Sequence, residues 1–581
     1  MSPSQIIVLA TPVFLLLMAI EWAVGWRRQL NTYRTADAVS SISLGALSQT
    51  SAAFTHLLRI GLYTLAYEQV ALWRNDGFWT SLPGWLLALL FYDFCYYWLH
   101  RMGHEVAVLW AAHAVHHQSQ DYNLSTALRQ TSSGALLGWI FYLPMALAGV
   151  PPLVFGVVAL IDLLYQFWVH TEQVGRLGWF DRWFCSPSNH RVHHAVNDAY
   201  LDKNYGGILV LWDRLFGTFQ DEDPQERCVY GTRGLLNSWD PVWANLQVYA
   251  GLWHDSWHAR RLSDKLRVWI KPPGWRPADV AERFPKPAFR LAQMVRFDPP
   301  LTPMMRVFAL LQLALLLATT AAFLWQADGA PLAHNALLFA ALLTQQWSLG
   351  AALQGRIPPA LAWMLQAGAA ATVSSALGWT AVHWVCKPLA MAIAIYLIAL
   401  RVYSLRAEVG FSLKPWLWMG AALAGSLAGD VALMLPGLFI PGLVSFLLAH
   451  LCYIALLRQG QRWFPHRGAL AATLLAGAVM YAFLWTNGLP AALRGPVAAY
   501  VIVIALMAAQ ALGRATALRT RGAWLVAAGA VCFMVSDSLL ATNRFVQPLP
   551  WAALWVLGTY YAAQALIVGG WLLEQRPRAA G

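Results

Sequence analysis

Nine of the sixteen histidines in this 581-residue chain lie between His100 and His194. They stand as His100-x-x-x-His104, His113-x-x-His116-His117, a single His170, and His190-x-x-His193-His194. Histidines four residues apart lie on one face of a helix, so both imidazoles can reach one ion. Imidazole nitrogens suit iron, zinc and copper. Because nine imidazoles exceed what one four- or six-coordinate ion can use, the pattern predicts a centre that holds two metal ions.

Histidines gathered by chance on the surface or in the core are the alternative interpretation. The clusters, however, lie in apolar, aromatic-rich sequence, where an unpaired imidazole is expensive to bury. We therefore interpret all nine as metal ligands.

The composition predicts a membrane protein. Hydrophobic residues make up 58% of the chain and charged residues 12%, against roughly 25% charged in an average soluble domain. Segments approaching the roughly 20 apolar residues of a membrane span lie at 6–26, 38–66, 79–99, 134–150, 153–169, 305–325 and 336–352, with about eight more between 360 and 573. We expect an all-α, polytopic fold whose first span is uncleaved, because it lacks a basic leader and a cleavage site.

The net charge of +12 could indicate a nucleic-acid partner, but the positions of the basic residues argue against one. Lys and Arg gather at the ends of the predicted spans, as with Arg27, Arg28 and Arg34 after the first. Such residues mark the cytoplasmic side of a membrane. The resulting topology places the amino terminus outside, the carboxyl terminus inside and every histidine cluster at the cytoplasmic face. Residues 257–300 are basic and tryptophan-rich, which predicts a segment lying against anionic headgroups.

Two acids within predicted spans are expected to support the ligands. Asp93 precedes His100 by seven residues on the same helical face, and Asp162, Gln166 and His170 follow one another at four-residue steps. Such a carboxylate can orient a ligand imidazole through its outer nitrogen. A helix-packing contact is the alternative, yet acids inside spans are costly and by default functional.

The histidine clusters resemble those of the fatty acid hydroxylase and sterol desaturase superfamily, and most closely its alkylglycerol monooxygenase branch. The resemblance rests also on Asn189-His190-Arg191-Val192-His193-His194, Asp202-Lys203-Asn204-Tyr205-Gly206-Gly207 and Leu211-Trp212-Asp213-Arg214-Leu215-Phe216-Gly217-Thr218-Phe219. It covers about residues 1–355 and implies a non-haem di-iron site that activates O2 and hydroxylates a C–H bond of a lipid. In this branch the ether-linked carbon is hydroxylated, and the hemiacetal falls apart to a fatty aldehyde and a glycerol derivative.

The resemblance leaves some details of the centre open. Some members carry a further histidine where this chain has Gln166, so nine ligands are expected rather than ten. Glu172 could supply an oxygen ligand or a supporting contact, and Asn204 is expected to support the site. Zinc could occupy the centre in purified protein, because it outranks iron(II) in intrinsic affinity. The reductant could be tetrahydrobiopterin or another electron donor.

Three ionisable residues lie within the predicted spans of the second half. Asp430, Asp537 and Lys387 fall at a similar depth, and two carboxylates in different environments can act as an acid and a base. Pairing that merely holds the helices together is the alternative. Further polar residues that could contact or support a substrate are His450, Tyr453, Asn543, Tyr560 and Gln564.

This half resembles the lysoplasmalogenases, which are eight-span membrane hydrolases. The matching stretches are Lys387-Pro388-Leu389, Gly425 to Asp430, Phe446 to Tyr453, Ser536 to Arg544 and Tyr560 to Leu566, within residues 357–573. The resemblance implies hydrolysis of the vinyl ether of lysoplasmalogen, in which one aspartic acid protonates the enol ether carbon and the other activates water.

The sequence therefore predicts a di-metal oxygenase domain at 1–355 followed by an eight-span helical bundle at 356–581. Together they would cleave saturated and vinyl ethers of glycerol lipids to fatty aldehydes. The alternative is a sterol, hopanoid or fatty acid hydroxylase or desaturase fused to a non-catalytic lipid-binding or transporter-like domain.

Overall fold

The computed structural model describes residues 3–408 and 411–575, which form helices and connecting loops. Extended pairing in these residues is limited to two isolated bridges, Phe184 with Leu209 and Ala195 with Tyr230. The chain divides into two compact units. The first runs to Asn335 and includes Leu349–Gln354, and the second comprises Ala336–Ser348 and the residues from Gly355 onward.

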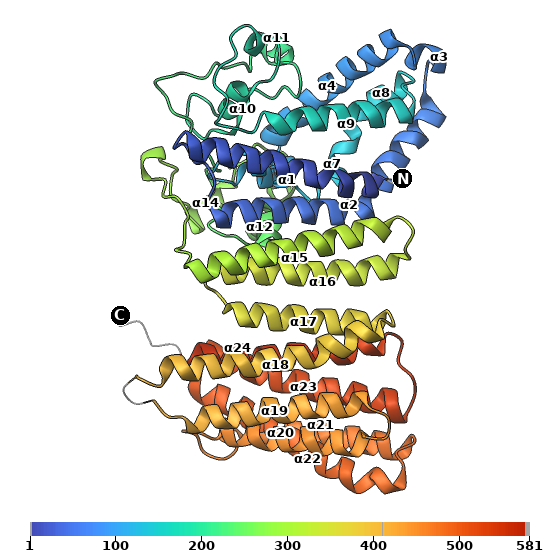
Figure 1. Ribbon diagram of the computed structural model, residues 1–581, viewed down its shortest axis with the longest axis vertical. Helices are drawn as coiled ribbons and strands as arrows, with labels where there is room; N and C mark the ends of the chain where they lie inside the picture. Colours follow the sequence, from blue (N-terminus) through green and yellow to red (C-terminus); the bar gives the residue numbers. More distant parts are fainter. Residues whose placement is uncertain (1–2, 409–410, 576–581) are drawn as a thin grey trace. The chain divides into compact units, whose positions relative to one another are not determined.

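Long helices and a loop-rich segment make up the first unit (Figure 1). Helix α15 (Pro303–Ala327) packs against both α1 (Pro3–Arg27) and α2 (Thr35–Val70). Helix α4 (Leu82–Glu105) contacts α5 (Ala107–His117) and α9 (Pro152–Trp168). The remaining helices are α3 (Asp76–Trp79), α6 (Leu124–Ala127), α7 (Gly134–Gly138), α8 (Leu143–Leu147), α10 (Pro187–His194), α11 (Leu211–Phe216), α12 (Pro241–His258), α13 (Leu262–Ile270) and α14 (Ala278–Arg283).

Helix α16 (Leu332–Leu353) contributes to both units, and eight helices follow it in the second. They are α17 (Pro359–Ala376), α18 (Thr380–Leu405), α19 (Lys414–Met434), α20 (Phe439–Leu457), α21 (Arg467–Thr486), α22 (Arg494–Leu518), α23 (Arg521–Phe545) and α24 (Ala552–Glu574). Small residues bring α23 and α24 close together, as membrane helices require. A Cβ on Gly529 would lie 2.8 Å from the Ala563 carbonyl oxygen, and one on Gly522 would lie 2.7 Å from that of Gly570.

Ten helices in the described residues are long and apolar enough to cross a membrane, which agrees with a polytopic protein. They are α1, α15, α16 and seven of the eight helices from α17 to α24, the exception being α17. Four predicted spans of the first half differ. The long helices α2 and α4 are not among these ten, and Asp93 is a buried acid within α4. The segments Gly134–Leu147 and Pro152–Trp168 are shorter than a span.

Candidate metal centre and second polar site

The nine predicted ligands gather into two groups of imidazoles. Group A consists of His100 and His104 from α4, His113 and His117 from α5, and His193 from α10. Group B consists of His116 from α5, His170, which follows α9, and His190 and His194 from α10. Within a group the ligand nitrogens lie within 4.8 Å of one another. Because adjacent residues on a helix point about 100° apart, α5 and α10 each supply ligands to both groups.

The Nε2 atoms converge inside each group. In group A, His113 Nε2 lies 3.1 Å from His100 Nε2 and 3.0 Å from His117 Nε2. In group B, the Nε2–Nε2 distances are 3.1 Å for His116 with His170, 3.1 Å for His170 with His190, and 3.2 Å for His190 with His194. Ligand nitrogens that share one ion at about 2.0–2.1 Å lie roughly 3 Å apart. The spacing therefore suits one ion in each group.

Backbone carbonyls fix the outer nitrogens of four rings. The Nδ1 atoms donate to carbonyl oxygens in the pairs His100–Tyr205 (2.8 Å), His116–Arg129 (3.0 Å), His170–Gln166 (2.7 Å) and His193–Lys203 (2.9 Å). A carbonyl only accepts, so Nδ1 carries the proton in each ring. The lone pair is then on Nε2, which faces the other imidazoles.

Burial and protonation also fit a metal. The Nε2 atoms of His104 and His193 are buried and have no hydrogen-bond partner among the described residues. Burial lowers the pKa of His116 to about 4 and the pKa of His193 well below its ordinary value of 6.5. Neutral imidazoles with inward lone pairs are the donors that iron and zinc take.

Asp93 does not contact an imidazole, contrary to our expectation. Its carboxylate accepts hydrogen bonds from the N–H groups of Ile208 (2.7 Å) and Leu209 (3.2 Å) and from the Trp212 indole (2.9 Å). These contacts hold the loop after Tyr205, whose carbonyl orients His100. Glycine is required in this loop, because a Cβ on Gly207 would lie 2.6 Å from Asp162 Oδ1 and 3.1 Å from Asp93 Oδ1. Asp93 thus acts on the ligand through the loop.

Asp162 and Gln166 form a chain that ends at His170. The Gln166 amide donates to Asp162 Oδ2 at 2.6 Å, and the Tyr96 hydroxyl donates to Gln166 Oε1 at 2.7 Å. Only the backbone of Gln166 contacts the ligand, since its carbonyl accepts from His170 Nδ1. The side chain of Gln166 is therefore occupied by supporting contacts and lies outside both imidazole groups.

The remaining two candidate residues lie around the centre. Glu172 belongs to neither group and interacts with Tyr230, which stacks on Tyr122 at a centroid distance of 4.9 Å. Asn204 donates to the carbonyls of Asn189 (3.0 Å) and Gln220 (2.8 Å), with φ of +57°. Asn204 therefore ties the start of α10, just before His190, to the loop at Gln220.

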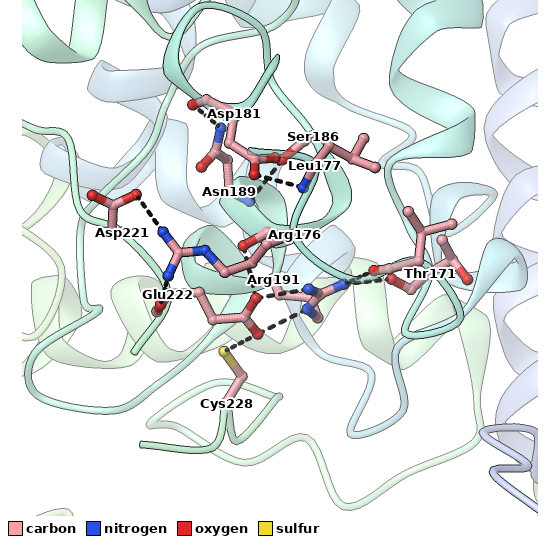
Figure 2. Close-up of polar contacts among 12 residues, drawn as sticks. Thr171, Arg176, Leu177, Asp181, Ser186, Asn189, Arg191, Asp221, Glu222 and Cys228 are labelled. Atoms are coloured by element: carbon pink, nitrogen blue, oxygen red, sulfur yellow. Dashed lines mark hydrogen bonds and ion pairs between the residues drawn. The ribbon is translucent and has the colours of Figure 1, made fainter. Parts of the chain in front are cut away.

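Arg191 was given no role in the sequence prediction, although it lies between two ligands. Its Nε and Nη2 donate to the two oxygens of Glu222 at 2.9 and 2.7 Å, and its Nη1 donates to the carbonyls of Thr171 (3.0 Å) and Val174 (2.8 Å) (Figure 2). This network joins α10 to the segment after His170. It therefore holds His190 and His194, which lie on α10, close to His170 in group B. A charged residue inside a histidine cluster was the available signal.

Glu222→Gln is expected to loosen group B. Burial favours a higher pKa for the Glu222 carboxyl, but the hydrogen bonds and charge of Arg191 outweigh it and hold the pKa below its ordinary value of 4.5. The carboxylate therefore stabilises the fold fully above about pH 4.5 and loses this effect as pH falls through the lowered pKa. The variant should lose about 1–3 kcal/mol of stability at pH 7 and retain less metal, measured by thermal unfolding and metal analysis.

Asp221→Asn is the matched control, because Asp221 pairs with Arg176 at 3.4 Å and both side chains are half exposed. Exposed pairs contribute about 0–1 kcal/mol. The difference in stability between wild type and Glu222→Gln should shrink below pH 4. Equal metal content in both variants would refute a role for this pair in holding the centre.

In the second unit, Asp430 lies in a buried polar cluster. Its Oδ1 is 3.4 Å from Lys387 Nζ, and its Oδ2 accepts from the Tyr560 hydroxyl at 2.5 Å. The Tyr453 hydroxyl donates to Gln564 Oε1 at 2.7 Å, and the Gln564 amide reaches the Tyr560 hydroxyl at 3.4 Å. Asp430 is thus held by a cation and a phenol.

Asp537 forms a second cluster with His450 and Tyr500. The Tyr500 hydroxyl donates to Asp537 Oδ2, and His450 Nε2 lies 2.9 Å from that hydroxyl and 3.7 Å from Asp537 Oδ2. The Phe533 ring packs against both His450 (4.7 Å between centroids) and Tyr560 (5.4 Å), so it separates the two clusters. Tyr500 was not named as a site residue from the sequence. It is a tyrosine within an apolar helix, which is the same feature that singled out Tyr453.

A cavity of about 490 Å³ opens beside Asp537. Asp537 and Tyr500 line it, together with largely apolar side chains from α19 to α23, whereas Asp430 and Lys387 do not. Asn543 does not line it either, and its Oδ1 accepts from Leu549 N–H at 2.8 Å in the loop that follows α23. Asp537 therefore faces the cavity, whereas Asp430 lies outside its lining.

The fold and the histidine site define a class, the fatty acid hydroxylases, whose family model matches residues 85–218. Within it, a relative from Homo sapiens, alkylglycerol monooxygenase, is 38% identical over 53% of this chain and 69% of its own length. The alkylglycerol monooxygenase of Danio rerio is 39% identical over 53% of this chain and 68% of its own length. The chain belongs to the alkylglycerol monooxygenase family.

A second match covers the other unit. The YhhN family model matches residues 382–571. A lysoplasmalogenase of Homo sapiens is 36% identical to this chain, and the match covers 25% of this chain and 59% of that relative. The chain is thus a fusion of regions homologous to the two kinds of enzyme, as the sequence predicted. The sterol hydroxylase and transporter alternative is not favoured. No solved structure matches the chain.

Proposed function

We propose that this chain is a bifunctional ether-lipid-cleaving membrane enzyme. Its first unit hydroxylates the ether-linked carbon of alkylglycerols with O2, and its second unit hydrolyses the vinyl ether of lysoplasmalogens. The two imidazole groups carry the proposal for the oxygenase, because nine rings, eight of them buried and His113 partly buried, converge in two groups. The domain boundary is proposed at residues 355 and 356.

Two iron ions are the proposed occupants of groups A and B, and when bound they supply the capacity to bind and reduce O2. The overall reaction places one oxygen atom in the C–H bond of the ether-linked carbon and reduces the other to water. Two electrons come from tetrahydrobiopterin or another donor, and two protons complete the water. The hemiacetal then breaks its bond to the glycerol oxygen and yields a fatty aldehyde and a free hydroxyl group. The chain's own residues keep the imidazoles neutral, oriented and shielded from water.

Vinyl ether hydrolysis in the second unit requires one proton donor and one water molecule. Asp537 faces the cavity, so we assign it the proton transfer to the enol ether carbon, which leaves an oxocarbenium ion. Water adds to the carbon bonded to oxygen, and loss of the glycerol oxygen as a hydroxyl releases the aldehyde. The Asp537 carboxylate left by this transfer accepts a proton from the attacking water. Asp430 is held by Lys387 and Tyr560 outside the cavity lining, so we assign it a supporting role in the polar cluster in place of the water activation that the resemblance implied.

The histidine centre is proposed to lie at the cytoplasmic side. The segment 257–300 supports this placement, because Leu262, Leu266 and Ile270 form an exposed apolar face on α13, at 74%, 65% and 64% exposure. Residues four apart share one helical face, and exposed basic residues such as Arg261 lie beside it. Such a helix fits the surface of a membrane with anionic headgroups.

Fatty aldehyde release by the purified chain in lipid nanodiscs tests the proposal. An alkylglycerol and a lysoplasmalogen are supplied separately, with and without O2 and reductant. We expect alkylglycerol cleavage to require both O2 and reductant, and vinyl ether cleavage to require neither. Aldehyde from neither substrate would overturn the ether-lipid assignment.

A further inference from the structure

The cavity beside Asp537 is long and apolar, with few charged groups. It follows α23 from Val531 to Phe545, a rise of about 21 Å at 1.5 Å per residue. Among the described residues that line it, Asp537 is the one acid and Arg544 the one lysine or arginine. A single acyl or alkyl chain suits such a space, and the two charged residues define where its polar part would lie.

Arg544 and Asp537 lie on the same face of α23. They are seven residues apart, which is two helical turns and about 10 Å along the axis. Arg544 is near the end of the helix, which places its exposed guanidinium at the end of the cavity where a lipid headgroup would meet water.

The Arg544 guanidinium has no acidic partner within the described chain. It lies 4.0 Å from the centroid of the Phe439 ring, and its N–H groups donate no hydrogen bond to another described residue. Two other cations differ from Arg544 in their surroundings. Lys387 pairs with Asp430. Arg494 lies 4.0 Å from the centroid of the Trp485 ring and does not line the cavity. The Arg544 guanidinium therefore has N–H donors without a partner in the described chain, at one end of the apolar cavity.

We propose that Arg544 binds the phosphate of a single-chain glycerophospholipid whose vinyl ether lies at Asp537. The inference rests on the proposed hydrolase function and assigns the residue that recognises the phosphate of its substrate. A planar guanidinium matches a phosphate with two parallel hydrogen bonds, and the glycerol backbone bridges the distance between the phosphate and the ether. If Arg544 merely anchored the helix at the membrane surface, it would not discriminate between headgroups.

Substrate discrimination tests this assignment. The ratio of kcat/KM for a lysoplasmalogen to kcat/KM for the phosphate-free 1-alkenylglycerol is measured under nitrogen for wild type, Arg544→Gln and Arg494→Gln. Arg544→Gln should lower the ratio by about tenfold or more, through a higher KM for the phosphate-bearing substrate. Arg494→Gln should leave the ratio within about twofold. An unchanged ratio in Arg544→Gln, or the same fall in both variants, would overturn the phosphate site.

Direct binding separates this inference from the hydrolase proposal. A saturated 1-alkyl lysophospholipid, which has no vinyl ether, is titrated into both variants and wild type in detergent without O2. Arg544→Gln should weaken binding about tenfold, with Arg494→Gln close to wild type. If Arg544→Gln alone loses binding and wild type does not cleave the vinyl ether, the hydrolase proposal is refuted and the phosphate site is retained. Equal binding by all three proteins would refute the phosphate site even where cleavage occurs.

Discussion

Asp537→Asn is expected to lower vinyl ether cleavage by at least about a hundredfold while alkylglycerol cleavage by the same protein continues. The asparagine amide keeps the shape of the carboxyl group but cannot donate its proton, and general acid catalysis contributes typically 10²–10⁴-fold. The measurement is aldehyde release from lysoplasmalogen under nitrogen, followed by release from an alkylglycerol with O2 and reductant. The second activity shows that the variant has folded.

Asp430→Asn is the informative comparison, because the two carboxylates have different surroundings. Asp430 does not line the cavity, and its removal leaves the Lys387 ammonium buried without its counter-ion. Breaking a buried pair costs about 3–5 kcal/mol, so this variant should lose stability together with activity. Vinyl ether cleavage within tenfold of wild type in Asp537→Asn would contradict the assignment of Asp537 as the acid.

Histidine spacing predicted the members of the centre but not their division between two groups. The spacing of His100 and His104 places both on one face of α4, and they fall in one group as that spacing suggests. His116 and His117 are neighbours, yet they lie in different groups, because each group is completed by rings from other segments. The approach of His170 and α10 depends on tertiary contacts, such as the Arg191–Glu222 pair, that no local pattern contains.

Apolar length predicted the second unit well and the first unit less well. Every helix from α17 to α24 corresponds to one of the eight expected segments. In the first unit, the segment expected at 134–150 is broken into α7, a 3₁₀ turn and α8, where Pro144 limits helix continuity. An apolar run specifies burial in either lipid or protein, so its length alone did not distinguish a span from a helix that packs around the metal centre.

His193→Ala is expected to lower alkylglycerol cleavage by at least about a hundredfold and to reduce bound iron to about one ion per chain or less. His193 belongs to group A, its Nδ1 is held by the Lys203 carbonyl at 2.9 Å, and its Nε2 is buried without a partner in the described chain. Removing even a residue that only orients a ligand costs 10–100-fold in affinity or activity, so losing the ligand itself should cost at least as much. Metal analysis and aldehyde release on the same preparation measure both effects.

His254→Ala is the matched control for this variant. His254 lies in α12, outside both groups, with its Nδ1 3.1 Å from Asp255 Oδ1. It should retain the metal content and alkylglycerol cleavage of wild type, and both variants should still cleave the vinyl ether, since the proton transfer proposed for Asp537 involves no metal. Full metal content in His193→Ala would contradict group A as an iron site. Loss of vinyl ether cleavage in that variant as well would indicate that the substitution had disturbed the whole protein, whereas its survival would establish that the two sites act independently.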